Sequence, residues 1–201
     1  MATVSMHNMF AVGSQFSRRW LALSFVILLS SCSSMSSPSP EELARIKNPP
    51  EEVREKLEIL APLTLQWYDE IEHQYLAKGR TLTADELSMA HTIGVARPEK
   101  VRVIILKDFP YPAHQALKMH TKNYGMGSSA ESGRTMGNII MLKAHRKDER
   151  WLLAYELAHI AQQEKMGRPA YVRRVITEYE LVGRNRSPLE LDAHKIAMEY
   201  Q

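Results

Sequence analysis

The segment 151–167, WLLAYELAHIAQQEKMG, is the feature that most limits how this chain of 201 residues can fold. It predicts a helix over about 149–165, and most of its central side chains are apolar: Leu152, Leu153, Leu157, Ala158 and Ile160. Glu156 stands among them, and a carboxylate that is buried without a partner costs free energy. Glu156 therefore favours a functional site on this helix, and the alternative is an ion pair with an arginine such as Arg173 or Arg174.

Three helices are predicted before the first strand. SPEE at 39–42 is typical of a capped helix start, and the two prolines at 49–50 end that short helix. Apolar residues at helical spacing predict a second helix over about 51–78, which Pro62 kinks or divides. Residues 83–94 begin with a second capping pattern and end on a glycine, which predicts a third helix.

The second half of the chain adds strands to these helices. VRVIIL (101–106) and NIIML (138–142) are rich in β-branched and apolar residues and predict two strands, with a polar loop over 123–133 between them. After the helix at 149–165, further helices are predicted over 171–181 and from 187 to the C-terminus. This order predicts an α+β domain with several helices packed on a small mixed sheet.

Residues 1–31 are predicted to be a secretory signal peptide. Arg18 and Arg19 precede an apolar run over 21–29, and no acidic residue occurs before Glu41. The run is too short to span a bilayer as a mature helix. SRRWL at 17–21 also resembles a twin-arginine export signal, so both the general and the twin-arginine route stay open.

The run ends in LSSC, and Cys32 is the only cysteine of the chain. This ending resembles a bacterial lipobox, which implies that Cys32 is lipidated and anchors the protein in the cell envelope. Because Ser33 follows the cysteine, the expected place is the outer membrane, facing the periplasm. A plain cleaved signal or a buried free cysteine is the alternative. Residues 33–48 would then form a Ser/Pro tether with a short helix, and 49–201 the domain.

Charge and motif content exclude several classes of function. The formal net charge is +3, and without residues 1–31 the chain holds 24 basic and 23 acidic residues. The sequence has no cluster of Lys and Arg residues, so nothing in it indicates a nucleic-acid partner. No Gly-rich phosphate loop or serine nucleophile elbow occurs, and the one cysteine is assigned to the anchor.

Tyr155, Glu156 and His159 carry the most specific pattern. In zinc peptidases with an HExxH helix, two histidines four residues apart bind one metal ion and the glutamate activates the metal-bound water. Here Tyr155 occupies the first histidine position. A phenol ionises near pH 10, so it is a poor zinc ligand at neutral pH.

The surrounding sequence extends this pattern. A strand at 138–142, a short polar turn and a helix with Gln162 after the motif resemble small bacterial zincin-like peptidases of the gluzincin type, over roughly residues 80–195. The segment GRNRSPLELDAHK (183–195) is similar to their later part, in which an acidic residue after a proline supplies the third zinc ligand. The resemblance implies a zincin-like fold, with Glu190 or, as an alternative, Asp192 in that role.

The resemblance leaves three interpretations of the site. In the first, the domain is a degenerate pseudo-enzyme that binds or scaffolds an envelope protein or peptide. In the second, His159, Glu190 and His194 form a rebuilt zinc site, because Glu190 and His194 are one turn apart on a predicted helix. In the third, the chain is an active metallopeptidase with Glu156 as the base and Tyr155 as an unusual ligand or a bystander.

Two simpler explanations compete with these interpretations. Glu190 could be the capping residue that pairs with Ser187, and His194 a surface side chain. The protein could also be a purely structural outer-membrane lipoprotein without a ligand site. A polar cleft lined by Glu156, His159 and Glu190 would count against the structural role, whereas a cleft filled by Tyr155, with Glu156 neutralised by an arginine, would favour it.

Overall fold

The computed structural model describes residues 36–201, and these form seven α-helices and one mixed three-stranded sheet. The α+β class predicted from the sequence is therefore confirmed. The expected signal peptide over 1–31 and Cys32 lie outside the described residues. The helices are α1 (Pro40–Lys47), α2 (Glu51–Tyr75), α3 (Ala84–Ile93), α4 (Gln115–Asn123), α5 (Arg150–Met166), α6 (Arg168–Val182) and α7 (Pro188–Ala197).

The predicted helix starts and stops are confirmed at α1 and α3. Ser39 and Thr83 each form a capping box with the glutamate three residues later. Gly94 ends α3 in a left-handed conformation, with φ of 100°, which glycine adopts without steric cost. Pro62 lies inside α2 but does not divide it, since the helix is continuous over Glu51–Tyr75.

The sheet contains one strand that the sequence analysis missed. β1 (Arg102–Leu106) pairs in parallel with β3 (Ile139–Lys143), and β2 (Gly133–Met136) pairs with β3 in antiparallel orientation. The strand order is β1-β3-β2, so β2 lies at an edge. Its sequence, GRTM, has no apolar alternation and so lacks the pattern typical of a strand.

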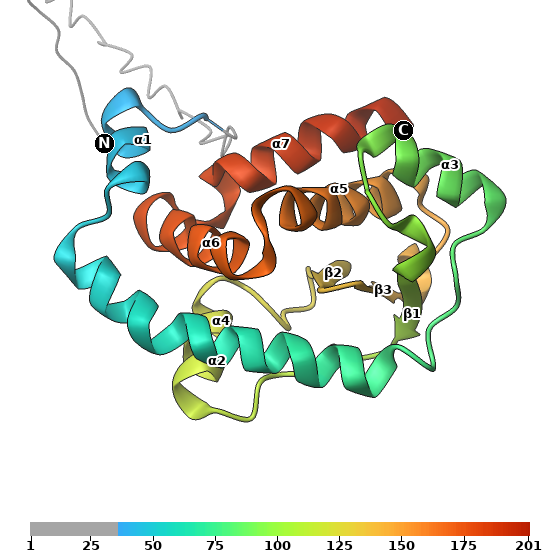
Figure 1. Cartoon of the computed structure of the whole chain (residues 1–201), viewed down its shortest axis with the longest axis horizontal. Coiled ribbons are helices and arrows are strands. Elements are labelled where there is room, and N and C mark those ends of the chain that lie inside the picture. Colours follow the sequence, from blue (N-terminus) through green and yellow to red (C-terminus); the bar gives the residue numbers. More distant parts are fainter. Residues whose placement is uncertain (1–35) are drawn as a thin grey trace, which may run out of the picture. The chain divides into compact units, whose positions relative to one another are not determined.

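β3 lies at the centre of the fold because both of its faces are covered. Ile139 and Met141 belong to a buried cluster with residues of α2 and α6, whereas Ile140 and Leu142 belong to a second cluster with residues of α3 and α5. Successive side chains of a strand point to opposite faces, so one strand serves both clusters. Figure 1 shows α2 on one side of the sheet and α5 on the other, with α7 beyond α5.

The first helix packs against the rest of the described unit. Ile46 of α1 is buried, and α1 contacts α6. Arg186, in the short 3-10 turn Arg184–Arg186 that precedes α7, donates two hydrogen bonds to the carboxylate of Glu42, at 2.9 and 2.6 Å. These contacts hold α1 beside the turn that also carries Arg184.

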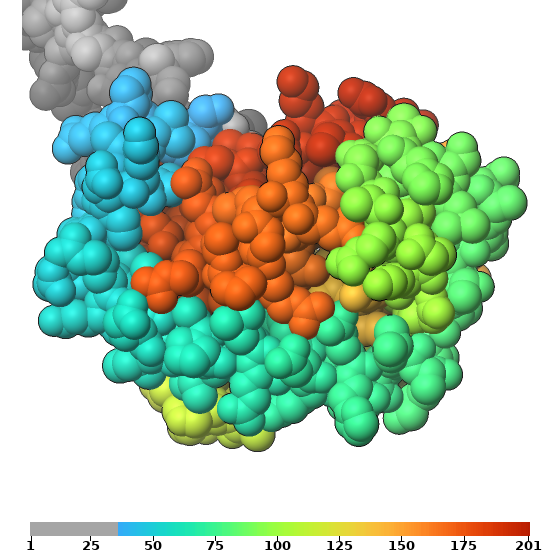
Figure 2. Space-filling model, viewed as in Figure 1, coloured from blue at the N-terminus to red at the C-terminus, as the bar shows by residue number. Residues whose placement is uncertain are grey.

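Figure 2, seen from the same side as Figure 1, shows the junction of α5 and α6 at the centre, with α2 along one edge and the region of α3 and β1 along another. None of the helices in residues 36–201 combines the length and the apolar character that crossing a membrane requires.

Candidate ligand-binding site

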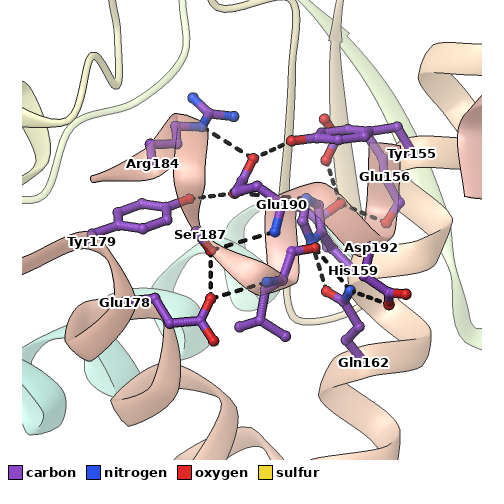
Figure 3. A network of polar contacts seen from close by, with 12 residues as sticks. Tyr155, Glu156, His159, Gln162, Glu178, Tyr179, Arg184, Ser187, Glu190 and Asp192 are labelled. Carbon is purple, nitrogen blue, oxygen red and sulfur yellow. Dashed lines mark hydrogen bonds and ion pairs between the residues drawn. The ribbon is translucent and has the colours of Figure 1, made fainter. Parts of the chain in front are cut away.

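Tyr155 and His159 lie on one face of α5, as their spacing predicts. Their rings meet edge to face, with centroids 4.8 Å apart and an angle of 83° between the ring planes. Both side chains point toward Glu190, which lies in the first turn of α7. Two helices that are distant in sequence thus bring Tyr155, His159 and Glu190 together (Figure 3).

Glu190 is a buried carboxylate surrounded by hydrogen-bond donors. The hydroxyl groups of Tyr155 and Tyr179 donate to its two oxygens, and Arg184 Nε donates to Oε2 at 3.3 Å. His159 Nε2 lies 3.9 Å from Oε1. Burial alone would raise the pKa of Glu190, but the charges of His159 and Arg184 and the two tyrosine hydrogen bonds outweigh it and lower the pKa. Glu190 is therefore held as an anion.

The helix-capping explanation accounts for the backbone of Glu190 but not for its side chain. Its backbone N–H donates to Ser187 Oγ at 3.4 Å, as a cap requires. In a capping box, the glutamate side chain would return to the backbone N–H of the serine. Here the side chain turns instead to Tyr155 and Tyr179. Glu190 is thus available to the site.

Tyr155 and Tyr179 act as hydrogen-bond donors rather than as anions. Burial, followed by the negative charge of Glu190, raises the pKa of the Tyr155 hydroxyl far above its usual range. The same two causes raise the pKa of Tyr179. In this arrangement both phenols keep their protons at neutral pH, and each proton is directed at Glu190.

Glu156 is almost fully buried, and its partner is a threonine. Thr135 Oγ1, on β2, lies 2.6 Å from Glu156 Oε2 and 3.0 Å from the backbone carbonyl of Glu156. The other oxygen, Oε1, lies against Gly133, where any side chain would clash with it. Burial raises the pKa of Glu156, and the charge of His159 and the threonine hydrogen bond offset only part of this rise.

The ion pair with Arg173 or Arg174, the alternative considered for Glu156, is not formed. Arg173 donates to Glu58 at 2.8 Å, and Arg174 donates to Glu178. Both arginines lie on α6 and pair with other carboxylates, and among residues 36–201 no arginine forms an ion pair with Glu156. In the described part of the chain, the Glu156 carboxylate has the Thr135 hydroxyl as its hydrogen-bond partner.

Gln162 fixes the orientation of the His159 ring. The amide nitrogen of Gln162 donates to the backbone oxygen of Leu189 and to Asp192 Oδ2, both at 3.0 Å. The amide oxygen must then face His159 Nδ1, 3.0 Å away, so Nδ1 carries a hydrogen. Nε2 is left directed at Glu190 (Figure 3). Asp192 thus acts through Gln162 and does not reach the site itself.

A cavity and a cleft meet at this network. Glu156, His159 and Glu190 line a cavity of about 90 Å³ between α2, α5 and α6. A larger open cleft of about 860 Å³ lies next to it. Glu156, Arg184 and Glu190 line both, so they form the boundary between the two spaces. His159 faces the inner cavity alone, whereas Tyr155 lines the outer cleft.

The residues considered for a metal site are only partly brought together. His159 and Glu190 face each other, but His194 lines the outer cleft. Within residues 36–201, no three His, Cys, Asp or Glu side chains are grouped so that they could hold a metal ion. Zinc sites need at least three protein ligands as a rule. Since Tyr155 is a protonated donor to Glu190, the donor set as it stands does not fit zinc.

Four residues of this site were not predicted from the sequence: Gly133, Thr135, Tyr179 and Arg184. Gly133 and Thr135 lie on the missed strand β2, and Tyr179 and Arg184 follow no recognisable spacing. In comparisons with known proteins, no family model, curated protein or solved structure matches this chain.

Proposed function

We propose that the chain is a lipid-anchored protein of the cell envelope whose zincin-like domain no longer binds catalytic zinc and serves to bind a peptide or protein segment. The anchor rests on Cys32 and the segment before it. The binding role rests on the cavity and cleft beside Glu156, His159 and Glu190. The reaction of a related active enzyme would be hydrolysis of a peptide bond, so a peptide is the natural ligand.

The observation that carries this proposal is the hydrogen bond from Tyr155 to Glu190. In the resembling zinc peptidases, the residues at these two positions and at His159 would be the three ligands of one ion. Here the Tyr155 hydroxyl donates a hydrogen bond to Glu190. Tyr179 and Arg184 also donate to this carboxylate. The three side chains still converge, which supports the zincin-like fold, but they satisfy each other.

A rebuilt zinc site is the second candidate, because one observation favours it. A histidine that ligates a metal through Nε2 commonly donates Nδ1–H to an oxygen behind it, and His159 is held in this way by Gln162. With Glu190 nearby, His194 would have to move inward from the outer cleft to complete three ligands. In that case the protein would be an active metallopeptidase with Glu156 as the base.

Zinc content separates the two candidates. The full-length chain, purified in detergent without chelator, would be analysed by mass spectrometry beside Tyr155→His and His159→Ala. We expect less than about 0.2 zinc ions per chain in the wild type and about one in Tyr155→His. In that variant an imidazole at this position joins His159 and Glu190 as the third ligand. About one zinc in the wild type that is lost in His159→Ala would instead establish the rebuilt site.

A double variant controls for zinc bound elsewhere. Tyr155→His combined with His159→Ala should bring the zinc content back to the wild-type level, because the site then lacks one of its three ligands again. If both Tyr155→His variants bind equal zinc, the metal is held outside the network and the zincin-like interpretation loses its support.

A further inference from the structure

Arg184 lies at the mouth of the cavity, and only one of its three side-chain nitrogens donates a hydrogen bond within residues 36–201. Its Nε donates to Glu190 at 3.3 Å. Its two terminal nitrogens have no acceptor among residues 36–201, and Figure 3 shows them turned away from Glu190. A guanidinium group stays charged at all physiological pH values, and its paired N–H groups match the two oxygens of a carboxylate.

The other arginines that line the cleft are already engaged by carboxylates. Arg146 pairs with Glu149, and Arg186 donates two hydrogen bonds to Glu42. Arg184, whose side chain is 30% exposed, therefore presents the open cationic group of this cleft within the described part of the chain. It is also the one of the three that borders the inner cavity.

The inner cavity offers an apolar space directly behind Arg184. Its wall on the side of α2, α4 and α6 includes Trp67, Leu117, Val175 and Ile176. The volume of about 90 Å³ is smaller than the roughly 150 Å³ of an apolar cavity that accommodates benzene. It suits a short aliphatic group better than an aromatic ring. The cleft outside is open and has a volume of about 860 Å³, which leaves room for further residues of a peptide.

The acidic residues beside Arg184 do not prevent an anion from approaching. Glu131 lies in both walls, but Arg134 neutralises it with two hydrogen bonds of 2.7 and 2.8 Å. The charge of Glu190 is spread over hydrogen bonds from Tyr155 and Tyr179 as well as Arg184. The terminal nitrogens of Arg184 thus stay without a carboxylate partner among residues 36–201.

We propose that this site binds the carboxyl-terminal end of a peptide, with the terminal carboxylate on the two free nitrogens of Arg184 and a short aliphatic last side chain in the cavity. The inference rests on the proposed function, because it names the ligand class of the same site. A free acyl amino acid has the same two groups as a peptide end. An inorganic or lipid phosphate would fit Arg184 but would leave the cavity unfilled.

The test compares a carboxylate with its amide. The tripeptide Ala-Ala-Leu, its C-terminal amide and N-acetyl-leucine would each be titrated into the full-length chain in detergent and followed by calorimetry. We expect the free tripeptide to bind about tenfold or more tightly than its amide, as a charge-assisted bidentate contact implies. Arg184→Gln should abolish this preference, and Arg184→Lys should reduce it.

Arg146→Gln is the matched control, because it removes a paired arginine from the same cleft and should leave the preference intact. Thermal unfolding of each variant would show that it is folded, and Arg184→Lys keeps the charge beside Glu190 if Arg184→Gln is unstable. Tighter binding of N-acetyl-leucine than of the tripeptide would identify a free acyl amino acid as the source of the carboxylate.

Three results would overturn the inference: equal binding of acid and amide, binding of neither, or competition by millimolar phosphate without any peptide binding. Each of them leaves the zinc measurement untouched, so the domain could still be a zinc-free binding module for another ligand. Conversely, a wild-type chain with one zinc would refute the proposed function whatever the peptides do.

Discussion

Replacing Glu190 with glutamine should lower the free energy of unfolding by about 2–4 kcal/mol at pH 7. The carboxylate accepts hydrogen bonds from Tyr155, Tyr179 and Arg184, and it is the one acceptor that Arg184 has in residues 36–201. An uncharged amide leaves the guanidinium without its counter-charge and can accept from fewer donors. Urea unfolding of wild type and variant would measure the difference.

The pH dependence of this effect has a definite sign. The pKa of Glu190 is lower in the folded protein than in the unfolded chain, since His159, Arg184 and the tyrosines outweigh its burial. Its stabilising contribution is therefore complete above the unfolded pKa of about 4.3 and is lost as the pH falls through the folded pKa. The gap between wild type and Glu190→Gln should accordingly narrow below about pH 4.

Glu199→Gln provides the comparison for Glu190→Gln. Glu199 is an exposed glutamate close to the end of α7, and its replacement should change stability by less than about 0.5 kcal/mol. If Glu190→Gln lowers the free energy of unfolding no more than Glu199→Gln does, then the network around Glu190 does not hold α5, α6 and α7 together. The meeting of these side chains would then give no support to the proposed function.

The parts of the fold that depend on local sequence could be predicted from it. Capping residues such as Ser39 and Thr83, together with the apolar spacing of α2 and α5, fix helix starts and faces without knowledge of the partners. β3 was recognisable because it is buried on both faces and therefore consists of apolar residues. These elements already determine the α+β class.

β2 was not predicted because its residues lack strand-like apolar alternation and several of their partners are distant in sequence. Arg134, a poor residue for a buried strand, is compensated by Glu131 and packs over Trp67 and Phe109. The strand then pairs with β3 and delivers Thr135 to Glu156. An apolar pattern is absent, and the local signal that could have indicated the strand is the two-residue turn Gly137–Asn138, which joins β2 to β3.

The site was predicted only in part: Tyr155, His159 and Glu190 do converge, whereas His194 lies in the outer cleft, and Tyr179 and Arg184 were not predicted. The spacing of Tyr155 and His159 and the resemblance around Glu190 identified side chains that do converge. Whether Glu190 meets a metal or a set of donors depends on Tyr179 and Arg184, which approach from α6 and the turn after it. Hydrogen-bond partners of this kind are set by the tertiary fold, so sequence spacing alone does not reveal them.

Replacing Glu156 with glutamine should stabilise the protein by about 1–2 kcal/mol at pH 7 and above. Glu156 is 2% exposed, and Thr135 is the hydrogen-bond donor that its side chain has in the described part of the chain. The amide oxygen of a glutamine can accept the same hydrogen bond, while the cost of burying a charge disappears. The free energy of unfolding would be measured across pH.

The sign of the pH dependence is opposite to that of Glu190. Burial raises the folded-state pKa of Glu156 above its unfolded value, so the folded protein holds the proton over a range in which the unfolded chain has lost it. Stability contributed by Glu156 is therefore present below about pH 4 and falls as the pH rises through the folded pKa. The advantage of Glu156→Gln should grow over that range and then stay constant.

Glu178→Gln tests whether this gain is specific to Glu156. Glu178 is equally buried, but it accepts from Arg174, Ser187 and the backbone of Leu189. Its replacement should therefore destabilise the protein. Opposite signs for two buried glutamates would mean that Glu156 is kept despite its cost to folding, as expected of a residue that acts on a ligand. Destabilisation by Glu156→Gln at every pH would make Glu156 a structural residue and remove it from the site.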